Sequence, residues 1–352
     1  MKRADQILAD IQFGDAVTDH AFALQKALRN LGYQSEIFAE HIHPALVGRA
    51  RPISAFHPGE LVIHHFAIGS GLNERIKEIK DCKKVLIYHN ITPPHFFEGY
   101  NLHSQTLCVQ ALQQLETLKD CYHLCIGVSE YNCEQLRNMG FLNVCALPIL
   151  YDFQHLPQEG DPAMMKALDT GTANILFLGR IAPNKKQEDV IKAFYLFQRI
   201  RPDSRLLLAG GYQGMEKYLN ELISLSSLLG IADKVSFLGK VSYETMTALY
   251  KRADLLLSMS EHEGFCVPLL EAMYFDLPVL AYASSAIPET LGGGGVLFYE
   301  KNYPLVAEMM ERMVTDQALR QDIISTQRER LKELDEAVIC KKFEAIIKDL
   351  KL

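Results

Sequence analysis

Residues 174–209 read NILFLGRIAPNKKQEDVIKAFYLFQRIRPDSRLLLA, and this stretch decides the fold class. Two runs that are apolar throughout, at 175–178 and 206–209, flank a helical pattern over 187–201. Fully apolar strands are typical of parallel sheets that are covered on both faces. Strands and helices that alternate in this way form right-handed crossover units. The stretch therefore predicts an α/β fold built on parallel sheets.

The same alternation extends along nearly the whole chain. In the first half, apolar patterns predict strands at 7–13, 34–39, 61–65, 84–89, 123–128 and 143–147, and helices at 19–31, 73–80, 104–119 and 130–139. In the second half they predict strands at 174–179, 205–209, 234–238, 254–258, 278–281 and 295–298. Helices are predicted there at 187–201, 215–229, 243–251, 267–275 and 303–314, followed by a further pair that runs to the C-terminus.

Polar, turn-forming residues interrupt the alternation at 151–171. This stretch contains the segments 158–162 and 170–172 and lacks a strand pattern. We interpret it as the linker between two Rossmann-like domains, at 1–150 and 151–334. The parallel sheets of the two domains are expected to face each other across a cleft. Because ligands of parallel sheets bind at the carboxyl ends of the strands, functional residues should follow strands directly.

The composition is that of a globular protein without a basic face. The chain has 352 residues, of which 48% are hydrophobic and 22% charged, and its net charge is −7 at pH 7. This balance suits two domains and argues against a nucleic-acid binder. The eight cysteines form no paired Cys-x2-Cys motifs, so reduced thiols are expected rather than a zinc site. No apolar run of about 18 residues occurs, so we predict a cytoplasmic protein that does not span a membrane.

Two carboxylates flank the start of a predicted helix in SEHEGFCVPLLEAM at 260–273, which follows a predicted strand. Pro268 suits the first turn of a helix, and Gly264 permits a close approach of the backbone to a ligand. The free N–H groups at the helix start form a site for an anionic group such as a pyrophosphate. Glu263 and Glu271 can each accept hydrogen bonds from the vicinal hydroxyls of a sugar or a ribose. The alternative for Glu271 is a solvated helix position.

A cationic loop, LGRIAPNKKQ at 178–187, follows the first strand of the second half. Arg180 and Lys185 are placed above the carboxyl end of that strand, where fixed cations can neutralise a diphosphate leaving group. Lys186 can share or replace the role of Lys185. The alternative is that these are surface charges on a loop.

A glycine separates the first strand from the first helix in FGDAVTD at 13–19. Gly14 lets the backbone approach a ligand closely. Asp15 or Asp19 can instead cap the helix, which is the commoner use of such residues. The sequence has no Gly-x-Gly-x-x-Gly fingerprint, which counts against a nicotinamide dehydrogenase.

A histidine ends a strand of the first half in VLIYHNITPPH at 85–95. His89 enters a proline-stiffened loop, so its imidazole is expected to face the cleft; a structural histidine is the alternative. His64 and His65 end another strand, and we expect them mostly in the core or behind the site. The aromatic residues of 93–100 suit stacking on a sugar, contact with a lipid interface, or core packing.

Taken together, these four segments resemble the retaining glycosyltransferases of family 4, which have the GT-B fold. Glu263 and Glu271 match the Glu-x7-Glu motif, Arg180 and Lys185 match the Gly-Arg-x4-Lys element, Gly14 matches the glycine-rich first loop, and His89 matches the strand-end histidine. The resemblance spans most of the chain and is strongest over 174–291. It is closest to bacterial members that build cell-surface polysaccharides or glycolipids, including mannosyl- and glucosyltransferases. The sequence departs from the common pattern at Lys186, where many members have glycine, and at Phe13, where many have a second glycine.

The resemblance implies a role for each matching residue. Arg180 and Lys185 would bind the diphosphate and stabilise the departing nucleoside diphosphate. Glu271 would hold the ribose hydroxyls, Glu263 would hold the donor sugar, and His89 would orient that sugar near its anomeric carbon. The expected catalytic residues are therefore His89, Arg180, Lys185 and Glu263. Further donor contacts are implied for Gly14, Lys186, Val241, Gly264, Phe265, Cys266 and Val267, with Val241 bordering the nucleobase.

The resemblance implies transfer of a hexose, with retention, from a nucleoside-diphosphate sugar such as GDP-mannose or UDP-glucose to a saccharide or lipid-linked acceptor. The sequence has no Asp-x-Asp motif, so a metal-independent enzyme without a cofactor is expected. No carboxylate is marked as a nucleophile, which favours an internal-return mechanism in which the leaving phosphate helps to deprotonate the acceptor. The alternatives are a GT-B phosphorylase, a sugar-nucleotide epimerase, and a non-catalytic subunit that keeps the fold.

The GT-B fold also implies how the domains divide the work. Residues 1–150 would bind the acceptor, residues 151–334 would bind the nucleotide sugar, and the last helix, at about 335–352, would cross back to the first domain. Closure would hinge near 150–153 and near 328–334. Synthesis of cell-surface polysaccharide or glycolipid would take place in the cytoplasm, and peripheral contact with the inner face of the membrane is left open.

Overall fold

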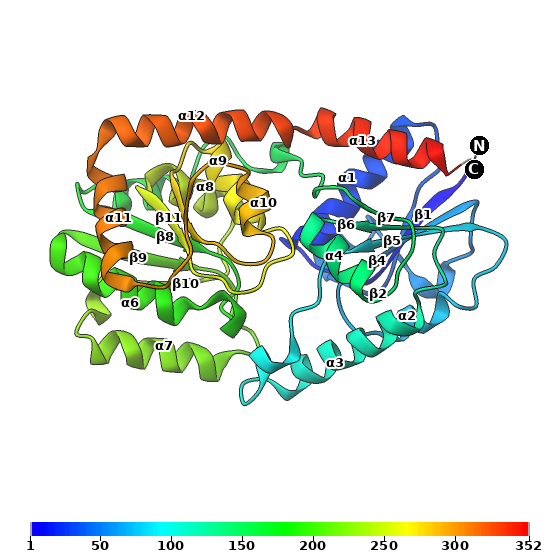
Figure 1. The fold of residues 1–352 in the computed structure, drawn as a ribbon, viewed down its shortest axis with the longest axis horizontal. Helices are drawn as coiled ribbons and strands as arrows, with labels where there is room; N and C mark the ends of the chain where they lie inside the picture. Colours follow the sequence, from blue (N-terminus) through cyan, green and yellow to red (C-terminus); the bar gives the residue numbers. More distant parts are fainter. Residues whose placement is uncertain (1, 351–352) are drawn as a thin grey trace. The chain divides into compact units, whose positions relative to one another are not determined.

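The computed structural model describes residues 2–350, which divide into two compact units. The first unit contains the chain up to His95, the segment Leu102–Asp152 and the chain from Leu334 onward. The second unit contains Phe96–Asn101 and Phe153–Glu333. Figure 1 shows that each unit has its own sheet with helices packed around it. Each unit therefore has a core of its own.

The first unit is built on a seven-stranded sheet in the order β3-β2-β1-β4-β5-β6-β7, and neighbouring strands are parallel. The strands are β1 (Ala4–Ile11), β2 (Ile37–Ile42), β3 (Arg51–Pro52), β4 (Leu61–Phe66), β5 (Lys83–Tyr88), β6 (Leu124–Gly127) and β7 (Val144–Ala146). The helices are α1 (Ala16–Asn30), α2 (Gly71–Arg75), α3 (Leu102–Thr117), α4 (Glu130–Asn138) and α13 (Glu336–Asp349).

The second unit is built on a six-stranded parallel sheet in the order β10-β9-β8-β11-β12-β13. The strands are β8 (Ala173–Leu178), β9 (Ser204–Ala209), β10 (Val235–Gly239), β11 (Leu255–Ser258), β12 (Val279–Tyr282) and β13 (Val296–Phe298). The helices are α5 (Pro162–Leu168), α6 (Gln187–Ile200), α7 (Glu216–Leu228), α8 (Tyr243–Arg252), α9 (Val267–Tyr274), α10 (Ile287–Leu291), α11 (Tyr303–Thr315) and α12 (Gln317–Glu333).

Both strand orders are those of doubly wound α/β sheets. The predicted α/β class with two Rossmann-like domains is confirmed. The expected cleft between the two sheets stays a prediction.

The central strands are buried, and most of their side chains are apolar on both faces. Ile175 and Leu176 of β8 are 0% exposed, and β4 is buried along its whole length. In α6, Val190, Ile191 and Phe194 form part of one buried stripe with helical spacing, and the helix covers the sheet with that stripe. Residues that follow these strands are therefore held on a rigid support.

Each sheet has a point where successive connections leave in opposite directions. This point lies between β1 and β4 in the first unit and between β8 and β11 in the second. At such a switch point the loops that follow the two central strands diverge and leave room for a ligand. In the second unit these loops are residues 179–186, which contain the predicted cations, and 259–266, which contain Glu263.

The region interpreted as a linker contains a helix that we did not predict. Asp161 caps α5 by accepting a hydrogen bond from the backbone N–H of Met164 (2.8 Å), and Pro162 occupies the first turn. The backbone N–H of Asp161 donates to the carbonyl of Glu244 (2.9 Å), in the first turn of α8. The Asp-Pro pair, which we interpreted as a turn, is also a helix-start signal. The short strand β3 and the short helix α10 were not predicted either.

Helix α13 lies in the first unit, where its N-terminus meets α1. The ammonium of Lys26 is 2.9 Å from Glu336 and 3.3 Å from Asp152. These side chains are partly exposed, so the ion pairs contribute little stability. The larger contribution is expected from the buried apolar side chains of α13, among them Ile339 and Phe343.

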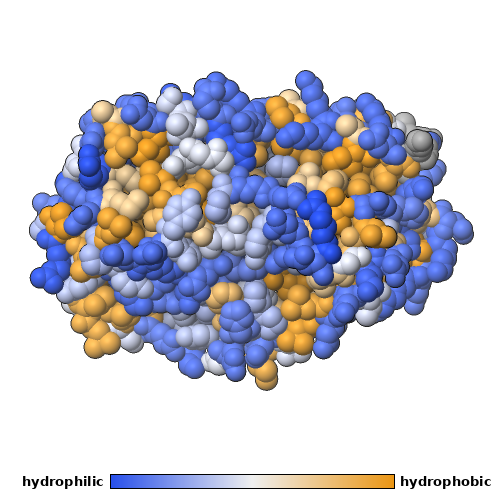
Figure 2. All heavy atoms as spheres, viewed as in Figure 1, coloured by the Kyte–Doolittle hydropathy of each residue, from blue (hydrophilic) through white to orange (hydrophobic). Residues whose placement is uncertain are grey.

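Exposed hydrophobic residues are spread over different elements. Figure 2 shows hydrophilic and hydrophobic residues interspersed on the face that it draws. Leu102, Leu142 and Leu228, for example, are each exposed and lie in or beside different helices. Among residues 2–350, no helix combines the length and the apolar character needed to cross a bilayer.

Candidate functional site

The cationic loop after β8 is a short turn that leads into α6. Pro183–Lys185 form a single 3-10 turn, and Lys186 takes the left-handed conformation with φ of 54° just before α6 begins. A left-handed backbone favours glycine, so Lys186 holds a conformation that is unfavourable for a residue with a side chain. The exposed Arg180 follows Gly179, and its carbonyl accepts a hydrogen bond from Gln187 Nε2 (2.9 Å).

The structure brings Lys185 and Glu263 together, although they are far apart in the sequence. Lys185 Nζ lies 2.6 Å from Glu263 Oε2, and the two side chains are 22% and 8% exposed. A half-buried ion pair at this distance is stronger than one in water because the effective dielectric constant is lower. One of the three ammonium protons of Lys185 is used by Glu263, so others can serve a ligand.

Lys186 lies close to the same site but is held by other carboxylates. Its Nζ is 3.5 Å from Glu188 Oε1 and 3.4 Å from Glu261 Oε2. Burial alone would lower the pKa of Lys186, but the neighbouring Glu188 and Glu261 raise it above its usual value. Lys186 is therefore a fixed cation on the loop.

An ion-pair network supports this loop from the side of α6. Lys301 Nζ contacts both Asp189 Oδ2 (2.8 Å) and Glu261 Oε1 (2.7 Å), and the Tyr303 hydroxyl donates to Asp189 Oδ1 (2.7 Å). Burial would raise the pKa of Asp189, but the hydrogen bonds from Lys301 and Tyr303 lower it below its usual value. The network fixes Glu261 beside Lys186 and thereby restrains the loop.

The loop before α9 has the geometry of an anion site. Cys266 precedes α9 in the left-handed conformation with φ of 74°, and it makes no side-chain capping hydrogen bond. Pro268 lies in the first turn, as predicted. Backbone N–H groups at such a helix start can bind an anion. Burial, together with the Glu263 carboxylate, raises the pKa of the Cys266 thiol well above its usual range, so this thiol stays protonated.

Glu271 is a buried acceptor rather than a solvated helix residue. It is 5% exposed, and its Oε2 accepts a hydrogen bond from the hydroxyl of Tyr250 (2.6 Å). Tyr250 lies on α8, outside the motifs that the sequence shows. A buried carboxylate needs hydrogen-bond donors, and a ligand hydroxyl can supply them.

Several predicted site residues line one small cavity at the carboxyl ends of β8 and β11. Lys185, Glu263, Cys266 and Gly179 are among the residues around it. Phe265 and Val267 are buried beside this group, and Gly264 is half-buried. Val241 lies apart from it, in the loop after the edge strand β10.

The segment Phe96–Asn101 adds a residue that the sequence did not assign to this site. Lys186 Nζ lies 5.9 Å from the centre of the Phe96 ring, and the rings of Phe96 and His262 are 6.4 Å apart. The segment is held by hydrogen bonds from Asn101 Nδ2 to the carbonyl of Gly214 (2.7 Å) and from Lys217 Nζ to the carbonyl of Gly99 (2.8 Å). Phe96 therefore belongs to the surroundings of the cationic loop, which only the folded contacts reveal.

Gly210 packs so closely against the start of the cationic loop that a side chain would not fit there. A Cβ at Gly210 would lie 1.9 Å from the carbonyl oxygen of Gly179 and 3.0 Å from the amide nitrogen of Arg180. Gly210→Ala is expected to destabilise the second unit by about 3 kcal/mol or more and to weaken ligand binding at the loop. Thermal unfolding and nucleotide titration measure both effects.

Gly230→Ala is the matched control for this variant. Its φ is +70°, but no atom in the described structure lies within 4 Å of the added Cβ. Only the backbone strain remains at this position, so we expect the variant to lose about 1 kcal/mol of folding stability. If Gly210→Ala and Gly230→Ala lost the same folding stability, the close contact between Gly210 and Gly179 would not be the cause of the loss.

In the first unit, Gly14 and Asp15 lie between β1 and α1. Gly14 has φ of 68°, which requires glycine or a strained residue. Asp15 caps α1, because its Oδ2 accepts hydrogen bonds from the backbone N–H (3.1 Å) and the hydroxyl (3.3 Å) of Thr18. The alternative that Asp15 caps this helix is confirmed, and Asp19 lies within its first turn.

Asp19 makes the stability of the first unit depend on pH. Burial, together with the Asp15 carboxylate, raises its pKa to about 7. Because this folded-state value lies above the unfolded value of about 3.9, the stabilisation is fully present below roughly pH 4 and lost as the pH rises through about 7. Asp19→Asn lacks this titration, so its melting temperature should rise relative to that of the unmodified chain between roughly pH 5 and pH 8.

The melting temperatures of Asp19→Asn and the unmodified chain, each recorded at about pH 5 and about pH 8, measure this difference. Asp233→Asn is the control. The Asp233 side chain is 77% exposed, so its substitution should leave the pH profile unchanged. A pH-independent difference between Asp19→Asn and the unmodified chain would contradict the assignment.

His89 is part of a cluster of three imidazoles in the first unit. His65 Nδ1 lies 2.9 Å from His89 Nε2, and His65 Nε2 lies 2.8 Å from Gln6 Oε1. The His20 ring packs edge-on against His89 with 5.3 Å between the ring centres. Burial lowers the pKa of all three histidines, so the rings are neutral. Sequence reasoning did not find His20 or Gln6, because neither lies in a recognisable motif.

The three histidines are also the residues that could hold a metal ion. His20, His65 and His89 each bring one ligand atom within 4.8 Å of the others. Neutral imidazoles are ligands for Zn²⁺ and related ions. His64, the other strand-end histidine, points to different partners: its ring nitrogens contact Tyr122 (2.7 Å) and Asn73 (3.1 Å). Both His64 and His65 are buried, as expected.

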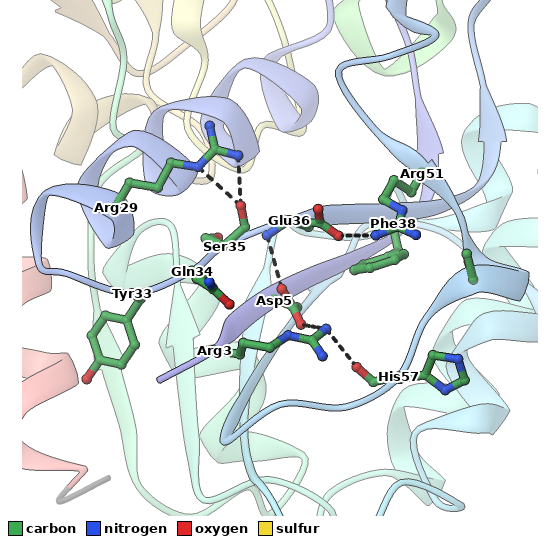
Figure 3. Close-up of a pocket in the computed structure, with 11 residues that line it drawn as sticks. Arg3, Asp5, Arg29, Tyr33, Gln34, Ser35, Glu36, Phe38, Arg51 and His57 are labelled. Atoms are coloured by element: carbon green, nitrogen blue, oxygen red, sulfur yellow. Dashed lines mark hydrogen bonds and ion pairs between the residues drawn. The ribbon is translucent and has the colours of Figure 1, made fainter. Parts of the chain in front are cut away.

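A separate cavity of about 620 Å³ lies in the first unit near the amino ends of β1 and β2, opposite to the carboxyl ends of these strands. Figure 3 shows Arg3 and Arg51 paired with carboxylates, whereas Arg29 donates to the carbonyl oxygen of Ser35. Arg3 is 2.6 Å from Asp5, and Arg51 is 2.6 Å from Glu36. The two guanidinium groups are thus already matched by carboxylates. Because ligands of parallel sheets bind at the carboxyl ends, this cavity is not the candidate site.

The predicted site residues are thus divided between the units. Gly14 and His89 belong to the first unit, and the predicted residues from Arg180 to Glu271 belong to the second. Within the second unit, Lys185 and Glu263 are in direct contact, Lys186 lies beside them, and Glu271 is bound to Tyr250.

Part of the second unit matches a known protein family. Residues 165–330 match the family described as "Glycosyl transferases group 1". A glycosyltransferase of Methanocaldococcus jannaschii, itself uncharacterized, is 33% identical over 153 residues, which are 43% of this chain and 38% of that protein. D-inositol 3-phosphate glycosyltransferase of Mycobacterium sp. (strain JLS) is 33% identical over 139 residues, which are 38% of this chain and 31% of that enzyme. The chain thus matches less than half the length of either relative.

Solved structures share the fold along nearly the whole chain. Anabaena HepE in complex with UDP-glucose superposes with a TM-score of 0.76 and 17% identity, over 98% of this chain and 99% of that one. Sucrose-phosphate synthase from Thermosynechococcus elongatus gives a TM-score of 0.77 and 17% identity, over 99% of both chains. At this identity the likeness establishes the fold alone, which is the GT-B fold predicted from the sequence.

Proposed function

We propose that this chain, whose residues 165–330 match the group 1 glycosyl transferases, transfers a hexose from a nucleoside-diphosphate sugar to a saccharide or lipid-linked acceptor. The observation that carries the proposal is the contact between Lys185 and Glu263 at the switch point of the second sheet. A cation for a phosphate and a carboxylate for a sugar hydroxyl are thereby fixed side by side. A nucleotide sugar requires both groups at its diphosphate–sugar junction.

The leaving nucleoside diphosphate is the charge that such a site must stabilise. Arg180, Lys185 and Lys186 follow one strand and place cationic groups on one loop. Fixed cations of this kind favour the transition state because negative charge develops on the diphosphate as the glycosidic bond breaks. We propose that these cations supply the stabilisation that a divalent ion supplies in metal-dependent transferases.

The two carboxylates divide the sugar groups between them. Glu263, beside Lys185, is assigned to the hydroxyls of the donor hexose, and the buried Glu271 is assigned to the ribose. Backbone amides around Cys266 would complete the phosphate site at the start of α9. His89 is assigned to the donor sugar near its anomeric carbon. Gly14 and Val241 are assigned to donor contacts as well, Val241 at the nucleobase.

Retention is proposed to follow an internal-return course. The bond between the anomeric carbon and the phosphate oxygen breaks, and the acceptor oxygen attacks from the same face. The leaving diphosphate takes the acceptor proton, so no protein carboxylate needs to form a covalent intermediate. Residues of the first unit are assigned to the acceptor. We also propose that the product is a polysaccharide or glycolipid made in the cytoplasm or at the inner face of the membrane.

The donor is identified by a thermal-shift screen with UDP, GDP and ADP and their hexose conjugates. A ligand that binds only the folded chain raises the melting temperature, and at a fixed concentration the rise is larger for a tighter ligand. UDP-glucose bound to the HepE fold neighbour makes UDP-hexoses the first candidates, and GDP-mannose is the second. Acceptor-dependent release of nucleoside diphosphate then tests transfer. Phosphate-dependent release of sugar 1-phosphate would instead show a phosphorylase, and conversion of the nucleotide sugar alone would show an epimerase.

A further inference from the structure

We propose that Gln6 and His65 set the tautomer of His89, so that His89 presents the lone pair of Nδ1 to a ligand hydroxyl. The tautomer follows from hydrogen bonds within the first unit. The inference rests on the proposed function only where it assigns that hydroxyl to a sugar. Gln6 and His65 are thus positioning residues, because they act through His89.

The chain of hydrogen bonds begins at a backbone carbonyl. Gln6 is fully buried on β1, and its Nε2 donates to the carbonyl oxygen of Ala21 on α1 (2.9 Å). A carbonyl oxygen can only accept, so the amide of Gln6 cannot be flipped without placing two oxygens against each other. Its Oε1 therefore points at His65 Nε2, 2.8 Å away. Because Oε1 can only accept, His65 carries its proton on Nε2.

The tautomer of His65 then dictates that of His89. A neutral imidazole with a proton on Nε2 has a lone pair on Nδ1. His65 Nδ1 lies 2.9 Å from His89 Nε2, and the two rings are stacked at 20°. This contact is a hydrogen bond only if His89 Nε2 donates the proton. His89 is therefore left with its lone pair on Nδ1.

His89 Nδ1 is the last atom in this series of hydrogen bonds. It is a buried atom that has no hydrogen-bond partner among residues 2–350. An unsatisfied buried acceptor is unfavourable, and an incoming O–H group removes the penalty. His20 packs edge-on against both His65 and His89, with interplanar angles of 87° and 79°, and so restrains the rings. A ligand must therefore offer a hydrogen-bond donor to His89, and a sugar hydroxyl does so.

The test measures the tautomers directly in the free chain. Long-range proton–nitrogen NMR spectra of protein labelled with ¹⁵N-histidine distinguish the Nε2–H from the Nδ1–H form. We expect both His65 and His89 as Nε2–H. His65→Gln keeps an acceptor for His89 and should preserve its tautomer, whereas His65→Leu removes the acceptor and should give a mixture. Gln6→Met should also mix the tautomers of His89, because it frees the ring of His65.

His64→Gln is the matched control, since His64 is buried on the same strand but bound to Tyr122 and Asn73. It should leave the signals of His89 unchanged. In the transfer assay, His65→Leu should lower kcat roughly tenfold or more, and His65→Gln should restore most of it. Because the spectra are recorded without donor, a chain that lacks transferase activity can still show the predicted tautomers.

Three results would overturn the inference. The first is a His89 that carries its proton on Nδ1 in the unmodified chain. The second is a His65→Leu variant, folded by its melting curve, in which His89 keeps a single Nε2–H tautomer. The third is one tightly bound Zn²⁺ per chain with shifted signals of all three rings, because a metal would then take the lone pairs that the hydrogen bonds are inferred to share.

Discussion

Lys185→Ala is expected to lower kcat of the transfer reaction by about 10²–10³-fold, the loss found when one fixed donor to a developing negative charge is removed. The ammonium group lies 2.6 Å from Glu263 on the loop after β8. Its removal takes a positive charge from the diphosphate and also leaves the largely buried Glu263 carboxylate without this cation. Single-turnover kinetics separate the chemical step from donor binding.

Two further lysines serve as controls for this variant. Lys192→Ala removes a 40% exposed side chain on α6 whose ammonium group pairs with Asp189 (3.2 Å) and lies 5.6 Å from the centre of the Tyr303 ring, so it should leave kcat nearly unchanged. Lys186→Ala removes the cation held by Glu188 and Glu261, and a loss below about tenfold is expected because those carboxylates already neutralise it. A larger loss at Lys186 than at Lys185 would show that the phosphate is held by the other lysine.

The fold could be predicted because its signals are local and repeated. The apolar runs of β8 and β9, the helical pattern of α6 and the loops between them each follow from a few neighbouring residues. The elements that were not predicted are short or ambiguous. Helix α5 begins with an Asp-Pro pair that also forms turns, and β3 has only two residues, one of them proline. A proline in a two-residue edge strand gives no alternation to detect.

The site could be predicted only as far as motifs identify single residues. Glu263, Glu271, Arg180 and Lys185 stand in recognisable spacings, so the sequence selects them as candidates for sugar and phosphate contacts, and these contacts stay predictions. Their partners depend on contacts between distant parts of the chain.

Tyr250 lies 21 positions from Glu271, and Gln6 lies 59 positions from His65. Phe96 reaches Lys186 from a segment of the first half of the chain. Such contacts depend on how elements pack, which no local pattern encodes.

Both units place candidate site residues at the carboxyl ends of strands at or near the switch point. In the second unit Lys185 follows β8 and Glu263 follows β11, and in the first unit Gly14 follows β1 and His89 follows β5, the neighbour of β4. The rigid sheet fixes where each loop begins, so short loops can hold charged groups with little freedom. Precise placement matters because catalytic groups lose effect when they shift by about 1 Å.

Glu271→Gln is expected to weaken binding of the nucleoside diphosphate by about 10- to 100-fold, which corresponds to about 1.5–3 kcal/mol for a hydrogen bond to a charged group. The carboxylate is 5% exposed, and its Oε2 accepts from the Tyr250 hydroxyl (2.6 Å). An amide oxygen can still accept from Tyr250, so the fold should persist. What is lost is the charged acceptor that we assign to the ribose.

A comparison of ribose with 2′-deoxyribose diphosphates makes this prediction specific. The unmodified chain should bind the ribonucleotide more tightly, and Glu271→Gln should lose most of this preference, as measured by calorimetric titration. Tyr250→Phe keeps both carboxylate oxygens and removes only the donor that orients them, so a smaller loss of roughly threefold to tenfold is expected. If Glu271→Gln weakens both nucleotides equally, the carboxylate acts on another part of the ligand, and the ribose must be held elsewhere in the second unit.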